Sequence, residues 1–500
     1  MKVVFRVDAS KYIGSGHVMR CLVLGDELKR KGYCILFACT PLKGDMRSLI
    51  RERGFEVISL PQPITSTTAV NDADYQAWLQ KSIAEDAYDF ISSVKSADLV
   101  ITDHYAIDEV WQKMVKNVIN CKLFAIDDLA RRHHADLILD QTLGRKPEDY
   151  LDSDTHVLSG SQFALLPPSF FKQRQAALLR KFPVDLPSVL VSMGGIDAPN
   201  TTLSILKALC DKVSANFTVL LSQRAPHFQE VKQWCASRTN VEHKEFVSDM
   251  ASLMLSHDIA IGAPGTTSWE RACLGLPNII IPIAENQRMI CEQLAIHGAS
   301  LSLEINQIPQ CLYNTYQKTV EQWASFKSAN LILCDGLGTR RVALEIEYLL
   351  NDGNDGVFLS RASLDDIELI YTWQCHPETR KYALSPHVPT WEEHKAWMMK
   401  KLQSTCDYYY MIIDRINSNK VGAVRLDRMN QGDYLVSIFI DPQRYGKGIA
   451  RKALAALDNL HSDVTLHATV LKNNLASQNL FQKAGYQKIN DDTFLRKAID

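Results

Sequence analysis

Paired-cysteine motifs, metal-binding motifs and long hydrophobic runs are all missing from this sequence. None of its 12 cysteines forms a CxxC pair, and neither an HExxH motif nor an EF-hand loop occurs, so we expect no metal ion. No stretch approaches the roughly 18 consecutive apolar residues that can span a bilayer, so we expect no membrane contact. Lys and Arg total 55 against 57 Asp and Glu, which leaves no basic surplus for binding nucleic acid.

The N-terminal residues and the cysteines together favour a cytoplasmic protein. Arg6 and Asp8 interrupt the apolar character of MKVVFRVDAS, which favours a first strand over a signal peptide. Cysteines without a pairing framework are typical of reduced thiols. Nothing in the sequence indicates an oligomeric state.

Two stretches of the chain have the pattern of α/β domains. Residues 1–145 and 146–350 each alternate short apolar runs with amphipathic segments, which predicts parallel sheets between helices. The Pro-containing stretch 145–186 is expected to be an irregular crossing between the two domains. The expected strands are 2–7, 33–39, 55–60, 99–103 and 122–127, then 188–192, 217–221, 258–261 and 278–281, and the expected helices include 17–31, 74–92, 202–212, 267–274 and 340–350.

A polar segment separates these domains from the rest of the chain. Residues 351–356, NDGNDG, contain two glycines and no apolar side chain, which is typical of a linker. Residues 357–500 then form a third domain, whose clearest elements are a strand at 434–440 and a helix at 451–460.

The first candidate site is a glycine-rich loop that ends in a histidine. Gly14 and Gly16 follow the first expected strand, and His17 begins the helix after it. The positive end of a helix favours the neutral imidazole, which is the form that accepts a proton from water. The alternative is a loop histidine that only makes hydrogen bonds.

Two further glycine-rich turns follow strands of the second α/β domain. Gly194 and Gly195 follow the strand at 188–192, and Gly265, Thr266 and Thr267 begin a helix after the strand at 258–261. Ligands of open α/β sheets bind beyond the carboxyl ends of the strands, and a helix N-terminus offers N–H groups to a diphosphate. The alternative is that these glycines only make tight turns.

The first 350 residues or so resemble a known family of nucleotide-sugar enzymes. They are similar to the hydrolase of pseudaminic acid biosynthesis, which releases UDP from UDP-2,4-diacetamido-2,4,6-trideoxy-β-L-altropyranose. The matching segments are RVDASKYIGSGHVMR (6–20), VITDHYAIDEVW (100–111), AIDDLA (125–130), LDQ (139–141), FALL (163–166), VSMGGIDAPN (191–200), IGAPGTTSWERACLGLP (261–277), ENQ (285–287) and DGLGTRRV (335–342).

This resemblance implies a fold and a set of site residues. The fold is GT-B-like, with two Rossmann-like domains facing a cleft, as in the glycosyltransferase that builds the peptidoglycan lipid intermediate. His17 matches the family's base that activates water, and Glu270 matches a glutamate that binds ribose hydroxyls. The residues expected to bind the nucleotide sugar are Gly14, Gly16, Gly194, Gly195, Gly265, Thr266, Thr267, Glu270, Asn286 and Gln287.

Polar residues at two strand ends of the first domain are candidates for contacting the sugar. Asp103, His104 and Tyr105 follow one strand, and Asp127 and Asp128 follow another. The alternative for the aspartates at 127 and 128 is that they cap the following segment.

The third domain carries a second phosphate-binding pattern. Gln443, Gly446 and Gly448 follow a dense β run and precede a helix, so successive N–H groups can hold a diphosphate. Together with 473–486, NNLASQNLFQKAGY, the pattern resembles the GNAT acetyltransferases, an α+β fold that uses acetyl-CoA. The residues that this resemblance assigns to acetyl-CoA are Ile438, Ile440, Gln443, Arg444, Gly446, Gly448, Ile449, Ala450 and Asn474.

One position departs from the GNAT pattern. Phe481 stands where many members have a tyrosine that protonates the departing thiolate. Tyr445, Tyr486 and solvent are the alternatives, and the sequence identifies no base.

Together the two resemblances imply a bifunctional enzyme acting on small molecules, UDP-sugar and acetyl-CoA. The third domain would acetylate the 4-amino group of a UDP-linked sugar, and the first two would hydrolyse the product to UDP and the free sugar. The alternatives are a UDP-sugar-dependent glycosyltransferase fused to an acetyltransferase of another amine, and a non-catalytic sensor of nucleotide sugar or CoA.

Overall fold

The computed structural model describes residues 1–10, 13–63, 74–150, 155–183, 185–351, 356–385 and 387–499. The chain divides into two compact units, Met1–Leu350 (unit 1) and Asn351–Asp500 (unit 2). The dividing point coincides with the start of the polar linker segment.

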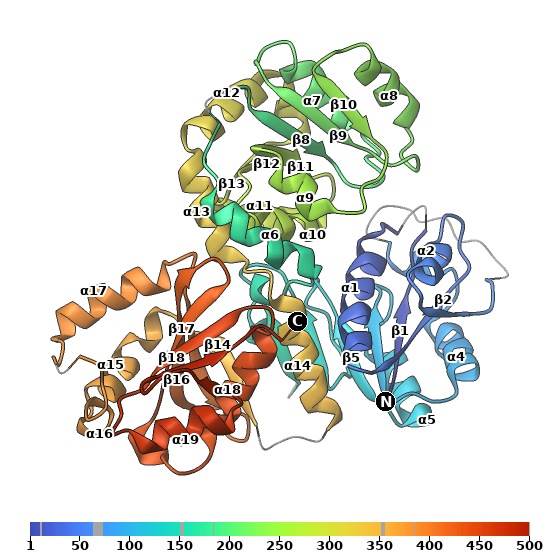
Figure 1. Cartoon of the computed structure of the whole chain (residues 1–500). Helices are drawn as coiled ribbons and strands as arrows, with labels where there is room; N and C mark the ends of the chain where they lie inside the picture. Colours follow the sequence, from blue (N-terminus) through green and yellow to red (C-terminus); the bar gives the residue numbers. More distant parts are fainter. Residues whose placement is uncertain are drawn as a thin grey trace. The chain divides into compact units, whose positions relative to one another are not determined.

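Unit 1 begins with a sheet of seven strands in which every described pair is parallel (Figure 1). The strand order is β3-β2-β1-β4-β5-β6-β7, which places β1 and β4 side by side at the centre. The strands are β1 (Lys2–Val7), β2 (Cys34–Cys39), β3 (Glu56–Ser59), β4 (Leu99–Asp103), β5 (Lys122–Ile126), β6 (Leu137–Asp140) and β7 (His156–Ser159). The helices among them are α1 (Gly16–Arg30), α2 (Arg47–Glu52), α3 (Gln76–Leu79), α4 (Ile83–Val94), α5 (Glu109–Ile119) and the 3-10 turn η1 (Pro147–Asp149).

The structure differs from the expected elements at two places in this sheet. The helix expected over 74–92 is two helices, α3 and α4, because Gln80 has a left-handed φ of 59° and Ser82 starts a new helix with a capping box to Glu85. The stretch 145–186 is not an irregular crossing throughout, since β7 extends the first sheet to Ser159. The first sheet therefore continues past residue 145, where the sequence places its boundary.

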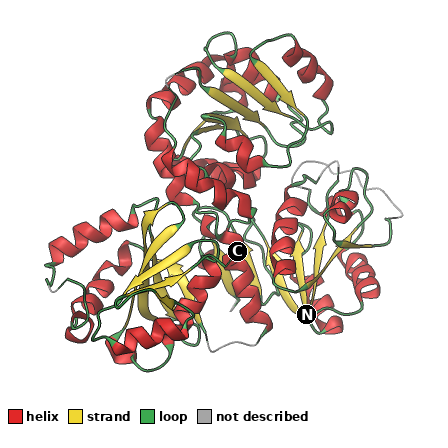
Figure 2. Cartoon of the chain, in the orientation of Figure 1, coloured by secondary structure: helices red, strands yellow, loops and turns green. Residues whose placement is uncertain are grey.

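The second sheet of unit 1 has six parallel strands in the order β10-β9-β8-β11-β12-β13. Helices flank its strands (Figure 2). The strands are β8 (Ser188–Ser192), β9 (Asn216–Leu220), β10 (Val241–Lys244), β11 (Ile259–Gly262), β12 (Asn278–Ile280) and β13 (Ser300–Ser302). The helices and 3-10 turns are η2 (Ser161–Phe163), α6 (Pro168–Leu179), α7 (Thr201–Leu209), α8 (Phe228–Ala236), α9 (Met250–Leu255), α10 (Thr266–Cys273), η3 (Glu285–Gln287), α11 (Arg288–Ile296), η4 (Ile305–Gln307), α12 (Ile308–Glu321), α13 (Trp323–Leu333) and α14 (Gly338–Leu350).

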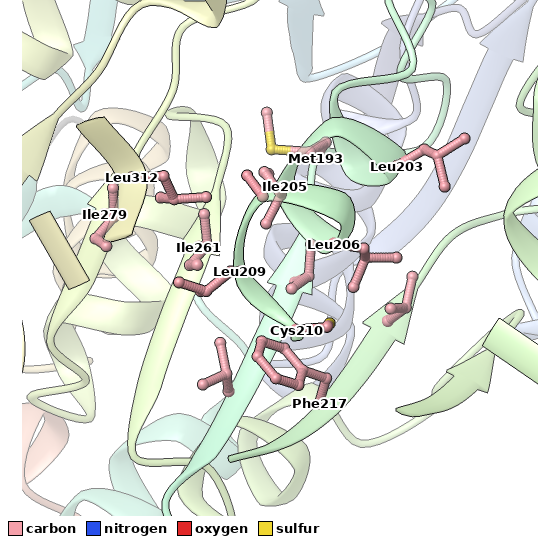
Figure 3. Close-up of a cluster of buried hydrophobic side chains, with 14 of the residues drawn as sticks. Met193, Leu203, Ile205, Leu206, Leu209, Cys210, Phe217, Ile261, Ile279 and Leu312 are labelled. Atoms are coloured by element: carbon pink, nitrogen blue, oxygen red, sulfur yellow. The ribbon is translucent and has the colours of Figure 1, made fainter. Parts of the chain in front are cut away.

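Side chains of α7 and the central strands form the core on one side of the second sheet (Figure 3). Ile205 and Leu206 of α7 are fully buried, as is Ile261 of β11. Met193, the first residue of a glycine-rich turn, is also fully buried in this cluster. Its side chain therefore anchors the turn while the glycines after it remain at the surface.

The last helix of unit 1, α14, packs against α1 and η2. An ion pair of 2.7 Å joins Lys31, next to the end of α1, to Glu347 of α14. Gly338 lets α14 begin directly against the backbone of Ala164, where a side chain would collide. The helix that carries His17 is thus supported by the final residues of the unit.

Unit 2 is a seven-stranded mixed sheet in the order β14-β15-β16-β17-β18-β20-β19. Neighbouring strands are antiparallel except β17 and β18, which are parallel. The strands are β14 (Val357–Arg361), β15 (Tyr408–Asp414), β16 (Lys420–Asn430), β17 (Asp433–Ile440), β18 (Thr465–Thr469), β19 (Gln487–Lys488) and β20 (Thr493–Arg496). The helices and 3-10 turns are η5 (Leu364–Asp366), α15 (Ile367–Cys375), α16 (Pro377–Arg380), α17 (Trp391–Leu402), η6 (Pro442–Arg444), α18 (Ile449–Leu460) and α19 (Leu475–Lys483).

The parallel pair β17–β18 separates part of the way along. Residues 433–435 of β17 pair with residues 465–467 of β18, yet β17 continues to Ile440 and β18 to Thr469. Beyond the last pair, the edge of β17 that faces β18 has no strand partner among the described residues. This separation opens the sheet for a ligand.

Candidate functional sites

His17 lies in the first turn of α1, and a buried carboxylate holds its ring. The His17 Nδ1 atom is 2.6 Å from Asp103 Oδ1, and 11% of the His17 side chain is exposed. Because a carboxylate only accepts hydrogen bonds, the proton lies on Nδ1. The neutral ring then has its lone pair on Nε2, which is the arrangement of a general base.

Arg20, one turn further along α1, fixes the same carboxylate. Its Nε donates to Asp103 Oδ2 at 2.6 Å and its Nη2 to Oδ1 at 2.7 Å, while Nη1 donates to Asp128 Oδ2 at 2.7 Å. Burial disfavours the charged carboxylate, yet Arg20 and then His17 hold the pKa of Asp103 well below its usual range. Asp103 therefore stays ionised and orients the imidazole.

Aromatic side chains limit the rotation of the His17 ring. Tyr105 meets His17 edge-on with ring centroids 4.7 Å apart, and Trp78, which stacks on Tyr105, lies 6.2 Å from His17. The Tyr105 hydroxyl donates to Asp128 Oδ2 at 2.9 Å. Burial and then Asp128 raise the pKa of Tyr105 well above its usual value, so Tyr105 remains a neutral donor.

The five polar residues considered as sugar contacts have different roles. Asp103 holds the imidazole, and the His104 side chain is buried. Asp127 accepts hydrogen bonds from the backbone N and the Nε of Arg131, both at 2.9 Å. It therefore caps the segment that follows it, which was the alternative to contacting the sugar. Asp128 has 21% of its side chain exposed and is the member of this group that lies open beside the histidine.

The glycines on either side of Ser15 leave open space at the start of α1. Gly14 and Gly16 are exposed, and a side chain at either would meet nothing within 4 Å. A ligand can therefore approach the backbone beside His17. Lys11 and Tyr12 of the same loop lie outside the described residues.

The two glycine-rich turns of the second sheet lie at one edge. They follow β8 and β11, which are adjacent and parallel, so both turns leave the carboxyl ends of neighbouring strands. Gly194 and Gly265 have φ values of 87° and 146°, and a side chain on either would project into open space. A side chain added at Gly195 would begin 3.7 Å from Ser15 Oγ.

Glu270 on α10 carries a carboxylate oxygen without a partner. Its Oε2 is buried and has no hydrogen-bond partner in the described part of the chain. Burial raises the pKa of Glu270 to about 7, against the lowering effect of Arg271. A buried acceptor of this kind is stabilised by a ligand that donates hydrogen bonds, such as a pair of hydroxyls.

Two other residues expected to bind the nucleotide sugar form hydrogen bonds to nearby backbone atoms. Gln287 Oε1 accepts from the backbone N of Ile283 at 2.8 Å, and Thr267 Oγ1 donates to Ala263 O at 3.3 Å. Both side chains therefore hold the turns in shape. Thr266 is the first residue of α10, and the side chain of Asn286 lies outside the described residues.

The glycine-rich turn of unit 2 is exposed between η6 and α18. Gly446 and Gly448 have φ values of 79° and 74°, and side chains there would meet nothing within 4 Å. Gln443 is exposed, and Arg444 lies 3.6 Å from Asp441. Ile449 and Ala450 begin α18, so their N–H groups are at the helix N-terminus, as an anion site needs.

A pocket of about 590 Å³ lies where β17 and β18 separate. Residues 435–439 of β17 and 469–471 at the end of β18 line it, together with Asn474 and Phe481 of the α19 segment. Ile438 and Asn474, both expected to bind acetyl-CoA, are therefore in the lining. Ile440 is buried beside Gly422 instead.

Neither tyrosine considered as a replacement for the missing acid lines this pocket in the described structure. Tyr486 is buried, and its hydroxyl donates to Asp458 at 3.2 Å, so that burial and then Asp458 raise its pKa far above the usual value. Tyr445 is 47% exposed and lies 3.2 Å from Thr379 Oγ1. Phe481 itself lines the pocket.

The sequence interpretation missed two residues of the His17 site. Arg20 lies within the matched N-terminal segment, and its position three residues after His17 on one helix was the available signal. Trp78 had no such signal, because it comes from α3, a four-residue helix far from any matched segment.

The part of the chain that the structure describes contains neither a candidate metal site nor a candidate membrane span. No group of three or more His, Cys, Asp or Glu side chains there could hold a metal ion. No helix there has the length and apolar character to cross a membrane.

Two family models match separate parts of the chain. The acetyltransferase (GNAT) domain matches residues 357–487, and the glycosyltransferase family 28 C-terminal domain matches residues 189–329. The first two sheets have the GT-B glycosyltransferase fold, which is also that of the spinosyn forosaminyltransferase SpnP (TM-score 0.50, 16% identity, covering 70% of this chain and 99% of that one). The chain thus joins a nucleotide-sugar enzyme to a GNAT acetyltransferase that uses acetyl-CoA.

Particular relatives resemble either the whole chain or its first unit. The uncharacterized protein MJ1062 of Methanocaldococcus jannaschii is 24% identical over 510 aligned residues, which cover 98% of this chain and 97% of that protein. The UDP-2,4-diacetamido-2,4,6-trideoxy-β-L-altropyranose hydrolase of Campylobacter jejuni is 27% identical over 246 residues, 48% of this chain and 77% of that protein.

Proposed function

We propose that the chain catalyses two consecutive steps on one nucleotide sugar. Unit 2 acetylates the 4-amino group of a UDP-linked 4-amino-4,6-dideoxy sugar with acetyl-CoA. Unit 1 then hydrolyses UDP-2,4-diacetamido-2,4,6-trideoxy-β-L-altropyranose to UDP and the free sugar, as in pseudaminic acid biosynthesis. Likeness to the Campylobacter hydrolase and to the GNAT domain supports this assignment.

The paired His17 and Asp103 side chains carry the hydrolase part of the proposal. Asp103 keeps the proton on Nδ1, so Nε2 can remove a proton from a water molecule. That water attacks the sugar carbon that bears the diphosphate, and UDP leaves. In a glycosyltransferase the same base would act on an acceptor hydroxyl instead of water, so the products separate the two functions.

The second sheet of unit 1 supplies the nucleotide site in this proposal. The open turns at Gly194 and Gly265 offer backbone N–H groups to the diphosphate, and α10 adds the positive end of its dipole. Glu270 Oε2, buried without a partner, accepts hydrogen bonds from the ribose hydroxyls. We place the boundary between the catalytic and nucleotide-binding domains after β7, near residue 160 instead of 145, because β7 belongs to the first sheet, and we place the acetyltransferase at 357–500.

The compartment follows from the substrates and the thiols. UDP-sugars and acetyl-CoA are cytoplasmic metabolites, and all twelve cysteines are unpaired, as expected in a reducing compartment. We therefore assign the enzyme to the cytoplasm.

The proposal is tested by incubating the full chain with the UDP-linked 4-amino sugar and acetyl-CoA, with mass spectrometry of the products. We expect the acetylated UDP-sugar first and then UDP with the free diacetamido sugar, in the presence of a chelator as well. His17→Gln should accumulate the acetylated UDP-sugar and release UDP about 10²–10⁴-fold more slowly. His297→Gln, an exposed histidine of the same unit, is the matched control.

Three outcomes would contradict the proposal. Sugar transfer to an added acceptor without hydrolysis would identify a glycosyltransferase. Stoichiometric binding without turnover would identify a sensor. UDP release by His17→Gln within a few-fold of the parent rate would exclude this histidine as the base.

A further inference from the structure

His394 lines the pocket of unit 2 and is almost completely buried. It lies on α17, with 2% of its surface exposed. Its ring packs among Tyr371, Trp391 and Trp397, with ring centroids 5.1, 6.3 and 6.0 Å away. Packing alone does not explain why an ionisable side chain lies among aromatic rings at the wall of this pocket.

One hydrogen bond fixes the tautomer of this ring. His394 Nε2 lies 3.2 Å from the carbonyl oxygen of Ile367. Because a carbonyl oxygen only accepts, the proton of the neutral ring lies on Nε2 and the lone pair on Nδ1. Burial lowers the pKa of His394, although the bond to Ile367 acts in the opposite direction. The ring is therefore neutral near pH 7 and able to accept a proton.

Two other ionisable groups around the pocket, Glu393 and His387, are already bonded to each other. Glu393 accepts hydrogen bonds from the backbone of Thr390 at 2.8 Å and from His387 at 3.2 Å, and these bonds lower its pKa. His387 is paired with that carboxylate, and its side chain is 66% exposed.

Several titratable or charged groups contact the His394 ring or line the same pocket. They are Tyr371 of α15, Tyr382 and His387 of the segment before α17, Glu393 of α17 itself, and Arg380 and Arg425, whose guanidinium groups are permanent cations. No carboxylate is bonded to His394 in the described structure, so its proton affinity is set chiefly by burial and by Ile367.

We propose that His394 Nδ1 is the base that deprotonates the acceptor amine in unit 2, a role that rests on the proposed acetyl transfer. One proton of the substrate ammonium passes to Nδ1, and the amine nitrogen attacks the thioester carbonyl carbon. The new N–C bond forms as the C–S bond breaks. A second proton leaves the nitrogen and ends on the CoA sulfur through solvent, and His394 returns its proton to solvent. The products are the amide, free CoA and one released proton.

The test compares kcat/KM for acetylation against pH in the parent chain, in His394→Gln and in His467→Gln as the matched control, because His467 lies on β18, bonds to Asp433 and is not in the pocket lining. With the base present, the profile is flat between the pKa of His394 and that of the amine. Without it, only the free amine reacts, so kcat/KM falls by about 10²-fold near pH 7 and rises tenfold per pH unit towards the pKa of the amine. His467→Gln should keep the parental profile.

Acetyl-CoA affinity, measured by calorimetry, checks that each variant is folded. An unchanged rate and profile in His394→Gln, with affinity retained, would overturn the role of His394 but leave the acetyl transfer intact. No acetylation by the parent chain would instead overturn the proposed function, and this role with it. If His394→Gln does not bind acetyl-CoA, the dependence of kcat/KM on pH in the parent chain decides. A plateau in kcat/KM below the pKa of the amine supports the proposal. A rise in kcat/KM of tenfold per pH unit up to the pKa of the amine overturns it.

Discussion

Replacing Asp103 with asparagine should stop UDP release while leaving a folded, nucleotide-binding chain. Asp103 accepts three short hydrogen bonds, two from Arg20 at 2.6 and 2.7 Å and one from His17 at 2.6 Å. An asparagine has one acceptor oxygen, so its NH2 group must face either the guanidinium or the imidazole. Either orientation removes at least one charged hydrogen bond.

The cost to stability can be bounded from these contacts. Breaking a buried charge pair destabilises a protein by about 3–5 kcal/mol, and the lower end applies here because Arg20 keeps its bond of 2.7 Å to Asp128. Domains are stable by about 5–15 kcal/mol, so Asp103→Asn should still fold. Urea unfolding measures the stability of Asp103→Asn, and UDP binding shows whether its nucleotide site is intact.

The cost to catalysis has a separate origin. An asparagine NH2 that faces the imidazole donates to His17 Nδ1 and moves the ring proton to Nε2, which removes the base. An NH2 that faces the guanidinium keeps the tautomer but removes the negative charge that stabilises the protonated imidazole formed in the reaction. We expect UDP release to slow by about 10²–10⁴-fold, with UDP affinity within a few-fold of the parent. Acetyl transfer by unit 2 should remain unchanged and serves as the internal control.

A double variant decides whether Asp103 acts through His17. If the two side chains work as one group, His17→Gln/Asp103→Asn should release UDP as slowly as His17→Gln alone, because groups that act together are not additive. Rate losses that multiply in the double variant would refute the reasoning, as would Asp103→Asn activity within tenfold of the parent.

Two further predictions concern the other ligand sites. Burial raises the pKa of Glu270 to about 7, above its unfolded value of about 4.3. The folded chain therefore loses stability as pH rises between these values, by up to about 4 kcal/mol. Glu270→Gln should flatten this dependence of stability on pH in urea unfolding, and an unchanged slope would contradict the assignment. Gly448→Val should weaken acetyl-CoA binding at least 100-fold by calorimetry (about 2.7 kcal/mol) while UDP release from the diacetamido substrate stays constant, and coupled loss of both would contradict independent units. Asparagine tolerates the φ of 74° at this position. Weak acetyl-CoA binding by Gly448→Asn would therefore be due to the filled space and not to backbone strain.

Most of the parallel strands could be predicted because each is a short, continuous apolar run. The strand at 2–7 has the predicted bounds, and β4 ends at Asp103 as expected. The strand β7 could not be predicted in the same way, since its four residues, HVLS, lie in a stretch otherwise marked by prolines. The break between α3 and α4 depends on one left-handed residue, Gln80, which no hydrophobic period records.

The candidate site residues also differ in whether a local motif contains them. His17, Glu270 and Gly448 could be named from local motifs, because the motif itself contains the loop and the helix start. The bond between His17 and Asp103 joins residues 86 positions apart, and only the adjacency of β1 and β4 brings them together. His394 could not be identified from sequence, since it lies in no motif and its role depends on a pocket built from several elements.

The packing of α14 against α1 affects the order in which the chain can fold during synthesis. The helix that carries His17 is complete after about 30 residues, but its supporting helix runs to Leu350. A ribosome therefore has to produce essentially all of unit 1 before the His17 site gains this support, whereas unit 2 comprises residues 351–500 alone. Truncation at about residue 337 should accordingly yield a nascent chain with both sheets synthesised and a loosely held His17 helix, prone to capture by chaperones.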